Sequence, residues 1–466
     1  MKEMPGDTIA AISTALGPGA VALVRLSGDA AIDLADRVFR GSRPLDACPT
    51  HTVHHGRILD SEGREVDEVL ATVMRAPNTY TTEHMIEFGC HGGPVPARRV
   101  LAVCLESGAR RARRGEFTER AFLGGRLDLI QAEAVADIVS AETPRGLEVA
   151  LGQLEGGLSD RLGELRATLV AMRSEIEAAI DFPEDVEAAP AVEEFRSLCG
   201  EGLAEVDSLL EGCEAGAAVR EGVSVALVGK PNVGKSSLMN ALLMRDRSIV
   251  TSTPGTTRDA IEEGLHLDGV AVRLVDTAGW RAAEDEAERA GVERARAAAR
   301  GADLVLFVVD GSEVPDAADE AIAAELEPAR TVVVANKDDL GRGAEVAEFT
   351  ALLAAGSTSR AGAARTCRVS ALSGAGLREL RAAVADAALG GDHADAVWVS
   401  NIRHVDALRR VREALARAGE LASAGQPHEL TAAELADATA ALGEITGETT
   451  PEDVLRRIFD RFCIGK

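Results

Sequence analysis

The sequence predicts a multidomain protein that joins α/β and all-α parts, in which one wound α/β block is inserted into a helical domain. The chain has 466 residues, more than a single hydrophobic core normally serves, so roughly two to four domains are expected. Apolar residues at helical spacing stand on both sides of a central block. Within this block, short apolar runs alternate with helix-length stretches, which is typical of a wound α/β sheet.

The first predicted domain, residues 1–124, has an α/β pattern of its own. Short β-type runs alternate with Gly/Pro turns, and these runs are Val21 to Leu26, Val69 to Met74 and Met85 to Phe88. A helix is expected around Arg98 to Leu105. Together these elements predict a compact α/β domain.

Helical periodicity marks residues 125–221 and 390–466. Apolar residues three and four apart from Leu151 to Ile180 predict a single long amphipathic helix that ends at Asp181-Phe182-Pro183. A second stripe follows residue 402, and Thr450 and Pro451 predict the N-cap and first-turn proline of a last helix. Because one-sided helices must bury their stripes, we expect both segments to form one helical domain around the inserted block.

Charge and cysteine content limit the function classes. A formal net charge of -26 repels polyanions, which argues against bulk, sequence-blind nucleic-acid binding. A candidate basic patch, which a solvated arginine-rich loop explains equally well, comprises Arg110, Arg111, Arg113 and Arg114. Seven scattered cysteines without a CxxC pair argue against a disulfide framework and a zinc site. With no apolar stretch of membrane length, we expect a cytoplasmic protein without a membrane partner.

The central block, residues 222–389, is expected to form one sheet. Asp268-Gly269 predicts a hairpin turn after an antiparallel strand near Ile261 to Leu267. The other predicted strands are Val223 to Val228, Val272 to Val275, Leu304 to Val309, Val332 to Ala335 and Arg368 to Ser370.

A phosphate-binding loop follows the first of these strands. GKPNVGKS, Gly229 to Ser236, fits the pattern G-x-x-x-x-G-K-[ST] between a strand and a helix. Its glycines let backbone N–H groups converge on phosphate oxygens at a helix N-terminus. Lys235 is expected to reach the β and γ phosphates, and Ser236 to ligate Mg²⁺.

Two further motifs identify the base as guanine. NKDD, Asn336 to Asp339, follows a buried strand and fits the N-K-x-D motif of Ras-like GTPases. The Asp339 carboxylate can accept hydrogen bonds from guanine N1–H and the exocyclic amine, which adenine does not offer in this arrangement. Ser370-Ala371-Leu372 matches the remaining base-contact loop. Asp339 therefore argues against an ATPase.

The switch segments complete the pattern of a Ras-like P-loop G domain. DTAG, Asp276 to Gly279, ends another strand, and GTTRD, Gly255 to Asp259, supplies Thr257 as a second magnesium ligand. Trp280 stands where Ras-like proteins carry a water-positioning glutamine, so other groups must serve instead. The candidates are a potassium ion held by Asn232 and a carboxylate of the acidic run Glu284, Asp285, Glu286 and Glu288, although a solvated flexible loop explains most of that run as well. The predicted nucleotide contacts are Asn232, Val233, Gly234, Lys235, Ser236, Ser237, Thr251, Ser252, Thr253, Pro254, Gly255, Thr256, Thr257, Asp276, Thr277, Ala278, Gly279, Asn336, Lys337, Asp339, Ser370 and Ala371.

Longer motifs lie in three separate regions of the chain. They are VRLSG, EFGCHGG, GEFTERAFLGGRLDLIQAEAVADI, EAAIDFPE, GTTRD and the terminal FCIGK. With these motifs the chain closely resembles the MnmE (TrmE) family of tRNA modification GTPases over essentially its whole length.

The resemblance implies a fold, a reaction and partners. It implies an N-terminal domain that dimerises and binds 5-formyl-tetrahydrofolate or a related reduced folate, a helical domain, and a G domain that dimerises across its nucleotides. The implied reaction adds an aminomethyl or carboxymethylaminomethyl group to carbon 5 of the wobble uridine of certain tRNAs. It would be carried out with the FAD-dependent protein MnmG in a heterotetramer-type complex, with tRNA as the substrate of that complex.

The resemblance also implies residue roles. Glu288 would orient the attacking water, and Ser236 and Thr257 would ligate Mg²⁺. The implied potassium ligands are Asn232, Thr251, Thr253 and Thr256, and the implied folate contacts are Arg25, Glu87, Arg126 and Lys466. Cys463 would lie near the pterin or simply be packed. An ordinary salt bridge is the alternative for Arg25 and Glu87. A second function class stays open: a GTP-driven assembly or switch factor, of the ribosome-maturation type, without modification chemistry.

Overall fold

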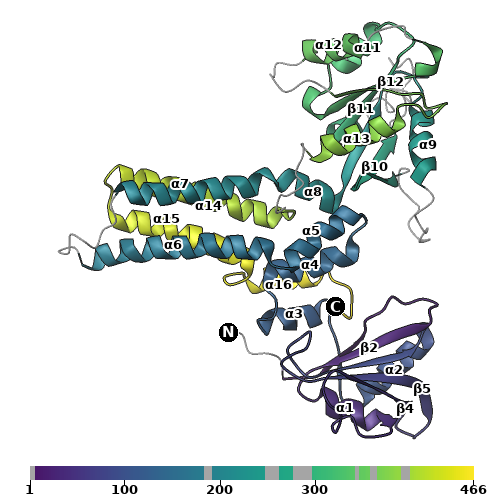
Figure 1. Ribbon diagram of the computed structural model, residues 1–466, viewed down its shortest axis with the longest axis vertical. Coiled ribbons are helices and arrows are strands. Elements are labelled where there is room, and N and C mark those ends of the chain that lie inside the picture. The colour runs from purple at the N-terminus through teal and green to yellow at the C-terminus, as the bar shows by residue number, and fades with distance from the viewer. Residues whose placement is uncertain are drawn as a thin grey trace. The chain divides into compact units, whose positions relative to one another are not determined.

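The computed structural model describes residues 6–182, 192–246, 262–276, 296–341, 346–356, 365–389 and 399–466. The chain divides into two compact units (Figure 1). The first comprises Met1–Val139, Ala150–Gly200 and Arg410–Lys466, and the second comprises Ser140–Val149 and Glu201–Arg409. The predicted division into segments 1–124, 125–221, 222–389 and 390–466 stays a prediction.

The first unit contains a seven-stranded sheet with the strand order β3-β4-β5-β6-β2-β1-β7. Its neighbours are antiparallel except β1 and β7, which are parallel. The strands are β1 Ile9–Ile12, β2 Val21–Ser27, β3 Phe39–Gly41, β4 Thr52–Leu59, β5 Glu65–Met74, β6 Met85–His91 and β7 Arg110–Arg111. The three strand runs predicted in this region are confirmed.

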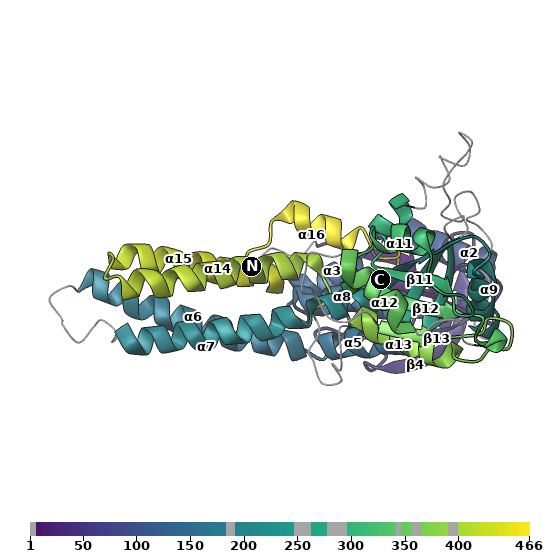
Figure 2. The same ribbon diagram turned by 90° about the horizontal axis from the view of Figure 1, so that it is seen from above.

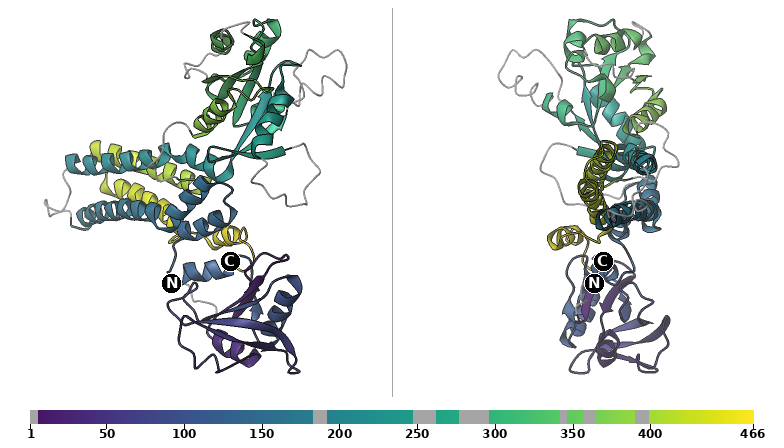
Figure 3. Two further views of the ribbon diagram at one scale, coloured as in Figure 1. Left: turned by 45° about the vertical axis from the view of Figure 1, so that its right-hand side comes forward. Right: turned by 90° about the vertical axis from the view of Figure 1, so that its left-hand side faces the viewer.

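Helices cover this sheet on both faces. Helices α1, Ala31–Val38, and α2, Pro94–Glu106, pack on one face over a large aliphatic core, so the helix predicted near residue 98 is confirmed. On the other face, Phe117 of α3, Glu116–Leu123, packs with Ile9 and Ala11 of β1. This second face also receives the C-terminal tail, because the Phe117 N–H donates a hydrogen bond to the Lys466 carbonyl (3.2 Å) (Figure 3).

Long helices complete the first unit, and several of them also have residues in the second unit. Helices α6 and α15 pack along each other, and Gly419 of α14 lies against Cys199 of α7, so chain segments from both sides of the central block share one bundle (Figures 1 and 2). The helical elements are α4 Leu129–Ser140, α5 Pro144–Leu154, α6 Gly157–Asp181, α7 Val192–Glu211, α14 Ile402–Ser423, α15 His428–Thr446 and α16 Glu452–Phe459. Among the described residues, no helix is long and apolar enough to cross a membrane.

Two helix predictions are wrong in detail. The single helix expected from Leu151 to Ile180 is α5 and α6, separated at Gly156, whose φ of 101° only glycine adopts readily. The apolar spacing does not reveal this break, although the end at Asp181 is confirmed. Thr450 is not an N-cap: its hydroxyl donates to the Glu444 carbonyl (2.8 Å), and Pro451 is the N-cap of α16.

The second unit contains a six-stranded sheet with the order β13-β12-β11-β8-β10-β9. Only the β9-β10 pair is antiparallel, and its turn at Asp268 and Gly269, with φ of 43° and 92°, confirms the predicted hairpin. The strands are β8 Val223–Val228, β9 Glu262–Leu267, β10 Val270–Asp276, β11 Leu304–Asp310, β12 Thr331–Asn336 and β13 Arg365–Arg368. Because Ser370 bonds to Ala375 in a turn (2.9 Å), the strand predicted through Ser370 ends instead at Arg368.

Helices cover both faces of this sheet, as in a Ras-like fold. Helices α8, Cys213–Glu221, α9, Lys235–Asp246, and α13, Leu377–Leu389, pack on one face, and α11, Ala317–Ala323, and α12, Val346–Gly356, pack on the other. The fold class predicted from the sequence, α/β and all-α parts with a P-loop G domain, is therefore confirmed.

Candidate functional site

The phosphate-binding loop connects β8 to α9 at the carboxyl end of the parallel strands. Gly229 has φ of 155° and a Cβ there would lie 2.1 Å from the Val308 carbonyl oxygen. Gly234 has φ of 97° and a Cβ there would lie 2.2 Å from Asn336 Nδ2. Only glycine fits at either position, and Asn232 is also left-handed at φ 65°. The loop is thus shaped by backbone conformations that bring its N–H groups toward one point.

Lys235 holds this loop closed. Its Nζ donates to the carbonyl oxygens of Gly229 (2.9 Å) and Lys230 (2.7 Å), and the side chain is buried. Ser236 and Ser237 follow in the first turn of α9, where both are exposed and no acidic residue is present. The positive end of the helix dipole and the lysine therefore favour a phosphate here.

The predicted base-recognition residues lie together at the neighbouring strand ends. Asn336 Nδ2 donates to the Val233 carbonyl (2.8 Å), and the Ala371 N–H donates to Asn336 Oδ1 (3.0 Å). Ser370 Oγ hydrogen-bonds Asp339 Oδ1 (2.5 Å). Asn336 thus ties the phosphate loop to the base-contact loop, and Ser370 orients the carboxylate that would recognise guanine.

Asp310 is a member of this site that the motif search missed. It ends β11, and its Oδ2 accepts from Lys337 Nζ (2.6 Å), while its Oδ1 accepts from Ser312 (2.5 Å). Burial alone would raise the pKa of the Asp310 carboxyl, but the hydrogen bonds from Lys337 and Ser312 outweigh it and hold the pKa below its ordinary value. Its position at a strand end, directly before Gly311, was the available signal.

Asp276 is the last residue of β10, and its backbone lies beside Leu227 of β8 in the parallel register. It therefore stands at the same sheet edge as the phosphate loop. The other predicted contacts fall outside the described residues: Thr251, Ser252, Thr253, Pro254, Gly255, Thr256, Thr257, Thr277, Ala278, Gly279 and Glu288, together with Trp280.

The first unit brings together the side chains of Arg25, Glu87 and Arg126 and the C-terminal tail. Arg25 Nε lies 2.7 Å from Glu87 Oε1, and both side chains are about four-fifths buried. Arg25 Nη1 also approaches the Gly465 carbonyl (3.5 Å). Lys466 reaches the same face through its backbone carbonyl, which accepts from Phe117.

Tyr80 links these residues, although the sequence analysis did not single it out. The guanidinium carbon of Arg25 lies 5.5 Å from the centroid of the Tyr80 ring, and that of Arg126 lies 5.0 Å from it. The Tyr80 hydroxyl forms a hydrogen bond with the Thr118 hydroxyl (2.9 Å). Arg126 Nη1 also donates to the Tyr80 carbonyl (3.2 Å). Burial raises the pKa of the Tyr80 phenol above its ordinary value. The only signal in the sequence was that Tyr80 is the single tyrosine.

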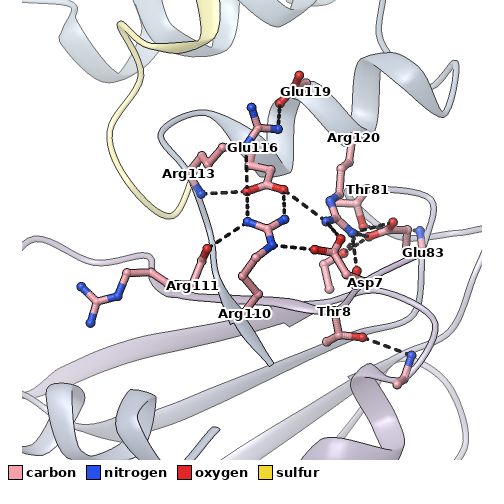
Figure 4. A network of polar contacts seen from close by, with 12 residues as sticks. Asp7, Thr8, Thr81, Glu83, Arg110, Arg111, Arg113, Glu116, Glu119 and Arg120 are labelled. Atoms are coloured by element: carbon pink, nitrogen blue, oxygen red, sulfur yellow. Dashed lines mark hydrogen bonds and ion pairs between the residues drawn. The ribbon is translucent and has the colours of Figure 1, made fainter. Parts of the chain in front are cut away.

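A buried polar network lies beside this cluster and changes the interpretation of the arginine-rich stretch (Figure 4). Arg110 pairs with Asp7 and Glu116 (both 2.5 Å), and Arg113 pairs with Glu119 (2.8 Å). Arg110 and Arg113 are exposed, as the solvated-loop interpretation expects, but their charges are matched by carboxylates: Asp7 from a distant segment, and Glu116 and Glu119 from the adjoining α3. Neither residue therefore adds free positive charge to a basic patch.

Family models match almost the whole chain. The model described as GTP-binding protein TrmE N-terminus matches residues 8–126, and the model described as MnmE helical domain matches residues 129–463. Among curated relatives, the tRNA modification GTPase MnmE of Geobacillus kaustophilus is 44% identical over 99% of both chains. The protein of the same name from Lysinibacillus sphaericus is 43% identical over 99% of this chain and 100% of its own.

Two solved structures resemble part of the chain. The G domain of the Thermotoga maritima FeoB iron transporter is 26% identical, with a TM-score of 0.26, and covers 36% of this chain and 98% of its own. Aquifex aeolicus Era bound to GDP and AlF4- is 28% identical, with a TM-score of 0.28, over 41% of this chain and 66% of its own. The full-length relatives and the family models show that this chain is a GTP hydrolase that belongs to the MnmE family of tRNA modification GTPases.

Proposed function

We propose that this protein hydrolyses GTP to drive modification of carbon 5 of the wobble uridine in certain tRNAs. In this proposal it is a cytoplasmic homodimer that acts with the FAD-dependent protein MnmG, and it takes the one-carbon unit from 5-formyl-tetrahydrofolate or a related reduced folate. The folate role is supported by one observation: Arg25, Glu87 and Arg126 cluster around Tyr80, and the C-terminal tail lies against this cluster. These residues come from distant parts of the sequence.

The nucleotide site supports a division of labour among its residues. Lys235 and the α9 N-terminus would bind the phosphates. Asp339 would accept from guanine through the lone pairs that Ser370 leaves free. Ser236 fits a magnesium ligand together with Thr257, because its exposed hydroxyl has no hydrogen-bond partner among the described side chains. Bound Mg²⁺ would neutralise charge that develops on the phosphates.

A potassium ion would fit beside the phosphate loop. Asn232 is exposed and left-handed, and its side chain forms no hydrogen bond within the described part of the chain, so its amide oxygen is available as a ligand. Thr251, Thr253 and Thr256 would complete the set, and Glu288 would orient the attacking water. The proposal predicts fast hydrolysis in potassium and slow hydrolysis in sodium at matched ionic strength with saturating GTP. Equal rates would reject the potassium role.

The folate cluster has the chemistry to hold a pterin and an anion. Glu87 uses Oε1 to accept from Arg25, and no described group donates to Oε2, which is thus available to pterin N–H groups. Arg126 is exposed above the Tyr80 ring, and Lys466 adds a second cation at the chain end. The reduced folate would supply the one-carbon unit, while these residues would bind and orient it.

Wobble-nucleoside analysis tests this function. Glu87→Gln and a truncation after Phe462 should abolish the wobble modification in a strain that lacks the native protein, while GTP hydrolysis stays near the wild-type rate. Phe462 is retained because it is buried against Phe459, with ring centroids 5.6 Å apart. Glu68→Gln is the matched control, since Glu68 is an exposed carboxylate on β5 of the same sheet. Normal modification in both site variants would favour a GTP-driven assembly or switch factor instead.

A further inference from the structure

The phosphate-binding loop carries a second lysine whose role its motif does not define. The pattern G-x-x-x-x-G-K-[ST] leaves the second position open, and this chain has Lys230 there. A lysine at this position could be taken for a second phosphate ligand. Its ammonium group lies instead between two carboxylates of another segment: Nζ is 2.9 Å from Asp316 Oδ2 and 2.8 Å from Asp319 Oδ2. Only 15% of the side chain is exposed, so the ammonium group is held at these carboxylates.

The second sheet brings the two segments together. Lys230 follows β8, and α11, with Asp316 as its N-cap, follows β11. Strands β8 and β11 are parallel neighbours in which Val228 pairs with Phe307, so both segments leave the sheet at its carboxyl edge. Lys230 thus connects the phosphate-binding loop to a carboxylate that is 86 residues away in the chain.

The two carboxylates are themselves fixed in place. Asp316 Oδ1 accepts hydrogen bonds from the N–H groups of Ala318 (2.9 Å) and Asp319 (3.1 Å), and the Asp316 N–H donates to Asp319 Oδ2 (3.1 Å). The Asp319 side chain is 2% exposed, and its Oδ1 has no hydrogen-bond partner in the described part of the chain. A buried carboxylate needs a compensating charge, and Lys230 supplies it.

The contact also stabilises the charge of the lysine. Burial by itself would lower the pKa of the Lys230 ammonium group, but the hydrogen bonds to Asp319 and Asp316 outweigh it and raise this pKa above its ordinary value. The hydrogen bond from Lys230 holds the pKa of the Asp316 carboxyl below its ordinary value. The loop is therefore anchored to α11 by ion pairs.

The anchor reaches the phosphate site through the backbone. The Lys230 carbonyl oxygen accepts a hydrogen bond from Lys235 Nζ (2.7 Å), and the Gly229 carbonyl oxygen accepts another from the same atom (2.9 Å). Pro231 disfavours helical backbone angles at the residue before it, which restricts Lys230 further. Because its side chain is held at α11 and its backbone is restricted, Lys230 presents its carbonyl oxygen to Lys235 in a fixed direction.

We propose that Asp316 and Asp319 position Lys235 for GTP hydrolysis, and that they act through Lys230. The ion pairs fix the Lys230 carbonyl oxygen, this oxygen orients the Lys235 ammonium group, and the ammonium group contacts the β and γ phosphates. Lys230 is thus a positioning residue and not a phosphate ligand. This inference rests on the proposed role of Lys235 in binding the phosphates.

Single-turnover hydrolysis by the full-length protein tests this proposal. Lys230→Met, which removes the charge, should slow hydrolysis at saturating GTP by about tenfold or more, because a displacement of about 1 Å near the reacting groups can cost about a hundredfold in rate. Lys230→Arg should restore a rate within about threefold of wild type, because a guanidinium group can donate to both carboxylates. A wild-type rate in Lys230→Met would overturn the proposal.

The matched control is Arg330→Met. Arg330 pairs with Glu327 (2.8 Å) and directly precedes β12, so it lies at the amino edge of the parallel strands, away from the nucleotide loops. Its substitution also removes a paired cation from the second unit, but the rate should stay at the wild-type value. Equal losses in Arg330→Met and Lys230→Met would show that any lost ion pair slows the enzyme, which contradicts positioning by Lys230.

The ratio of GTP affinity to ITP affinity separates positioning from a general distortion of the site. ITP lacks the exocyclic amine that Asp339 would recognise, so this ratio reports on the base-recognition loop. Lys230→Met should leave the ratio within about twofold of the wild-type value, since the base contacts are independent of Lys235. A large fall in the ratio would show that the substitution disturbs the whole site, and it would overturn the proposal.

A variant with both Asp316→Asn and Asp319→Asn tests whether Lys230 acts through these two carboxylates. Asparagine keeps an acceptor for the N-cap of α11 while both charges are lost. This protein should itself hydrolyse GTP as slowly as Lys230→Met, and it measures the same contacts even if Lys230→Met is unstable. Adding Lys230→Met to it should slow hydrolysis no further, because the ion pairs are already absent. A further loss of the same size would overturn the assignment of the carboxylates.

Lys235→Ala distinguishes failure of this inference from failure of the proposed phosphate role. Loss of GTP binding in Lys235→Ala together with a wild-type rate in Lys230→Met would overturn this inference alone. Wild-type GTP affinity in Lys235→Ala would overturn the proposed role of Lys235 and this inference together.

Discussion

Replacing Arg120 with methionine removes the cation at the centre of the buried network in the first unit (Figure 4). Arg120 is 1% exposed, and its guanidinium donates to both carboxylate oxygens of Glu83 (2.9 and 3.1 Å), to Asp7 (2.8 Å) and to Glu116 (3.2 Å). Methionine keeps most of the side-chain volume. The main consequence is therefore an uncompensated buried charge rather than a cavity.

The expected loss is about 3 kcal/mol of local stability. Removing one partner of a buried ion pair costs about 3 to 5 kcal/mol. The lower end of this range applies because both carboxylates retain another partner when Arg120 is replaced. Glu116 still pairs with Arg110 (2.5 Å), and Glu83 still accepts a hydrogen bond from the Ser27 hydroxyl (2.7 Å). Since about 1.4 kcal/mol corresponds to a factor of ten, the opening constant should rise roughly a hundredfold.

This loss should depend on pH with a definite sign. Burial already raises the pKa of Glu83, although Ser27 and Arg120 lower it in part. Without Arg120 this pKa rises further, so the carboxyl can bind a proton instead of keeping an unpaired charge. The destabilisation should be small below the ordinary pKa of a glutamate and should grow as the pH rises through the raised value.

Hydrogen exchange of the full chain measures this locally, which avoids a two-state assumption for a multidomain protein. Peptides from β2 and β6 should lose about 3 kcal/mol of opening free energy in Arg120→Met, while β8 and β11 of the second unit stay unchanged. Arg113→Met is the matched control: Arg113 is 54% exposed and should cost less than about 1 kcal/mol. Adding Glu83→Gln to Arg120→Met should restore part of the loss. A deficit below about 1 kcal/mol, or equal deficits in Arg120→Met and Arg113→Met, would refute the reasoning.

Three further predictions concern the nucleotide site. Gly234→Ala should abolish GTP binding in a fluorescent-nucleotide assay, because the added Cβ would meet Asn336 at 2.2 Å with a left-handed backbone; binding within about threefold of wild type would contradict the loop geometry. Asp339→Asn should weaken GTP binding by about tenfold or more and should favour binding of xanthosine triphosphate. The reason is that O2 of xanthine can accept a hydrogen bond from the new amide, which lies beside Ser370. Undiminished GTP affinity would rule out the base assignment. Glu288→Ala should lower the single-turnover rate of hydrolysis about a hundredfold with near-normal GTP affinity, whereas lost affinity at an unchanged rate would indicate a structural residue.

Local sequence patterns predicted three strands of the first sheet, most strands of the second sheet and the nucleotide motifs. The hairpin at Asp268-Gly269 followed from two residues that tolerate positive φ, and the phosphate loop followed from glycine spacing between a strand and a helix. The break at Gly156 was missed because the apolar stripe continues on both sides of it. The spacing of apolar residues indicates which face of a helix is buried, but it does not show that the backbone changes direction at one residue.

By itself, the sequence determined the alternation of elements in the central block, the guanine-nucleotide motifs and the family, because these depend on residues that are close together in the chain. Only the tertiary structure decided which of the adjacent arginines are neutralised. Arg110 pairs with Asp7, 103 residues away in the chain, and Arg120 pairs with Glu83, 37 residues away. Arg111, by contrast, lines a cavity together with Arg98 and Leu101 of α2. The structure also joined Arg25, Glu87 and Arg126 around Tyr80 beside the tail. These side-chain contacts form because the sheet and the helix that covers it bring residues from distant parts of the chain within a few ångströms of one another. The spacing of residues along the sequence does not contain that information.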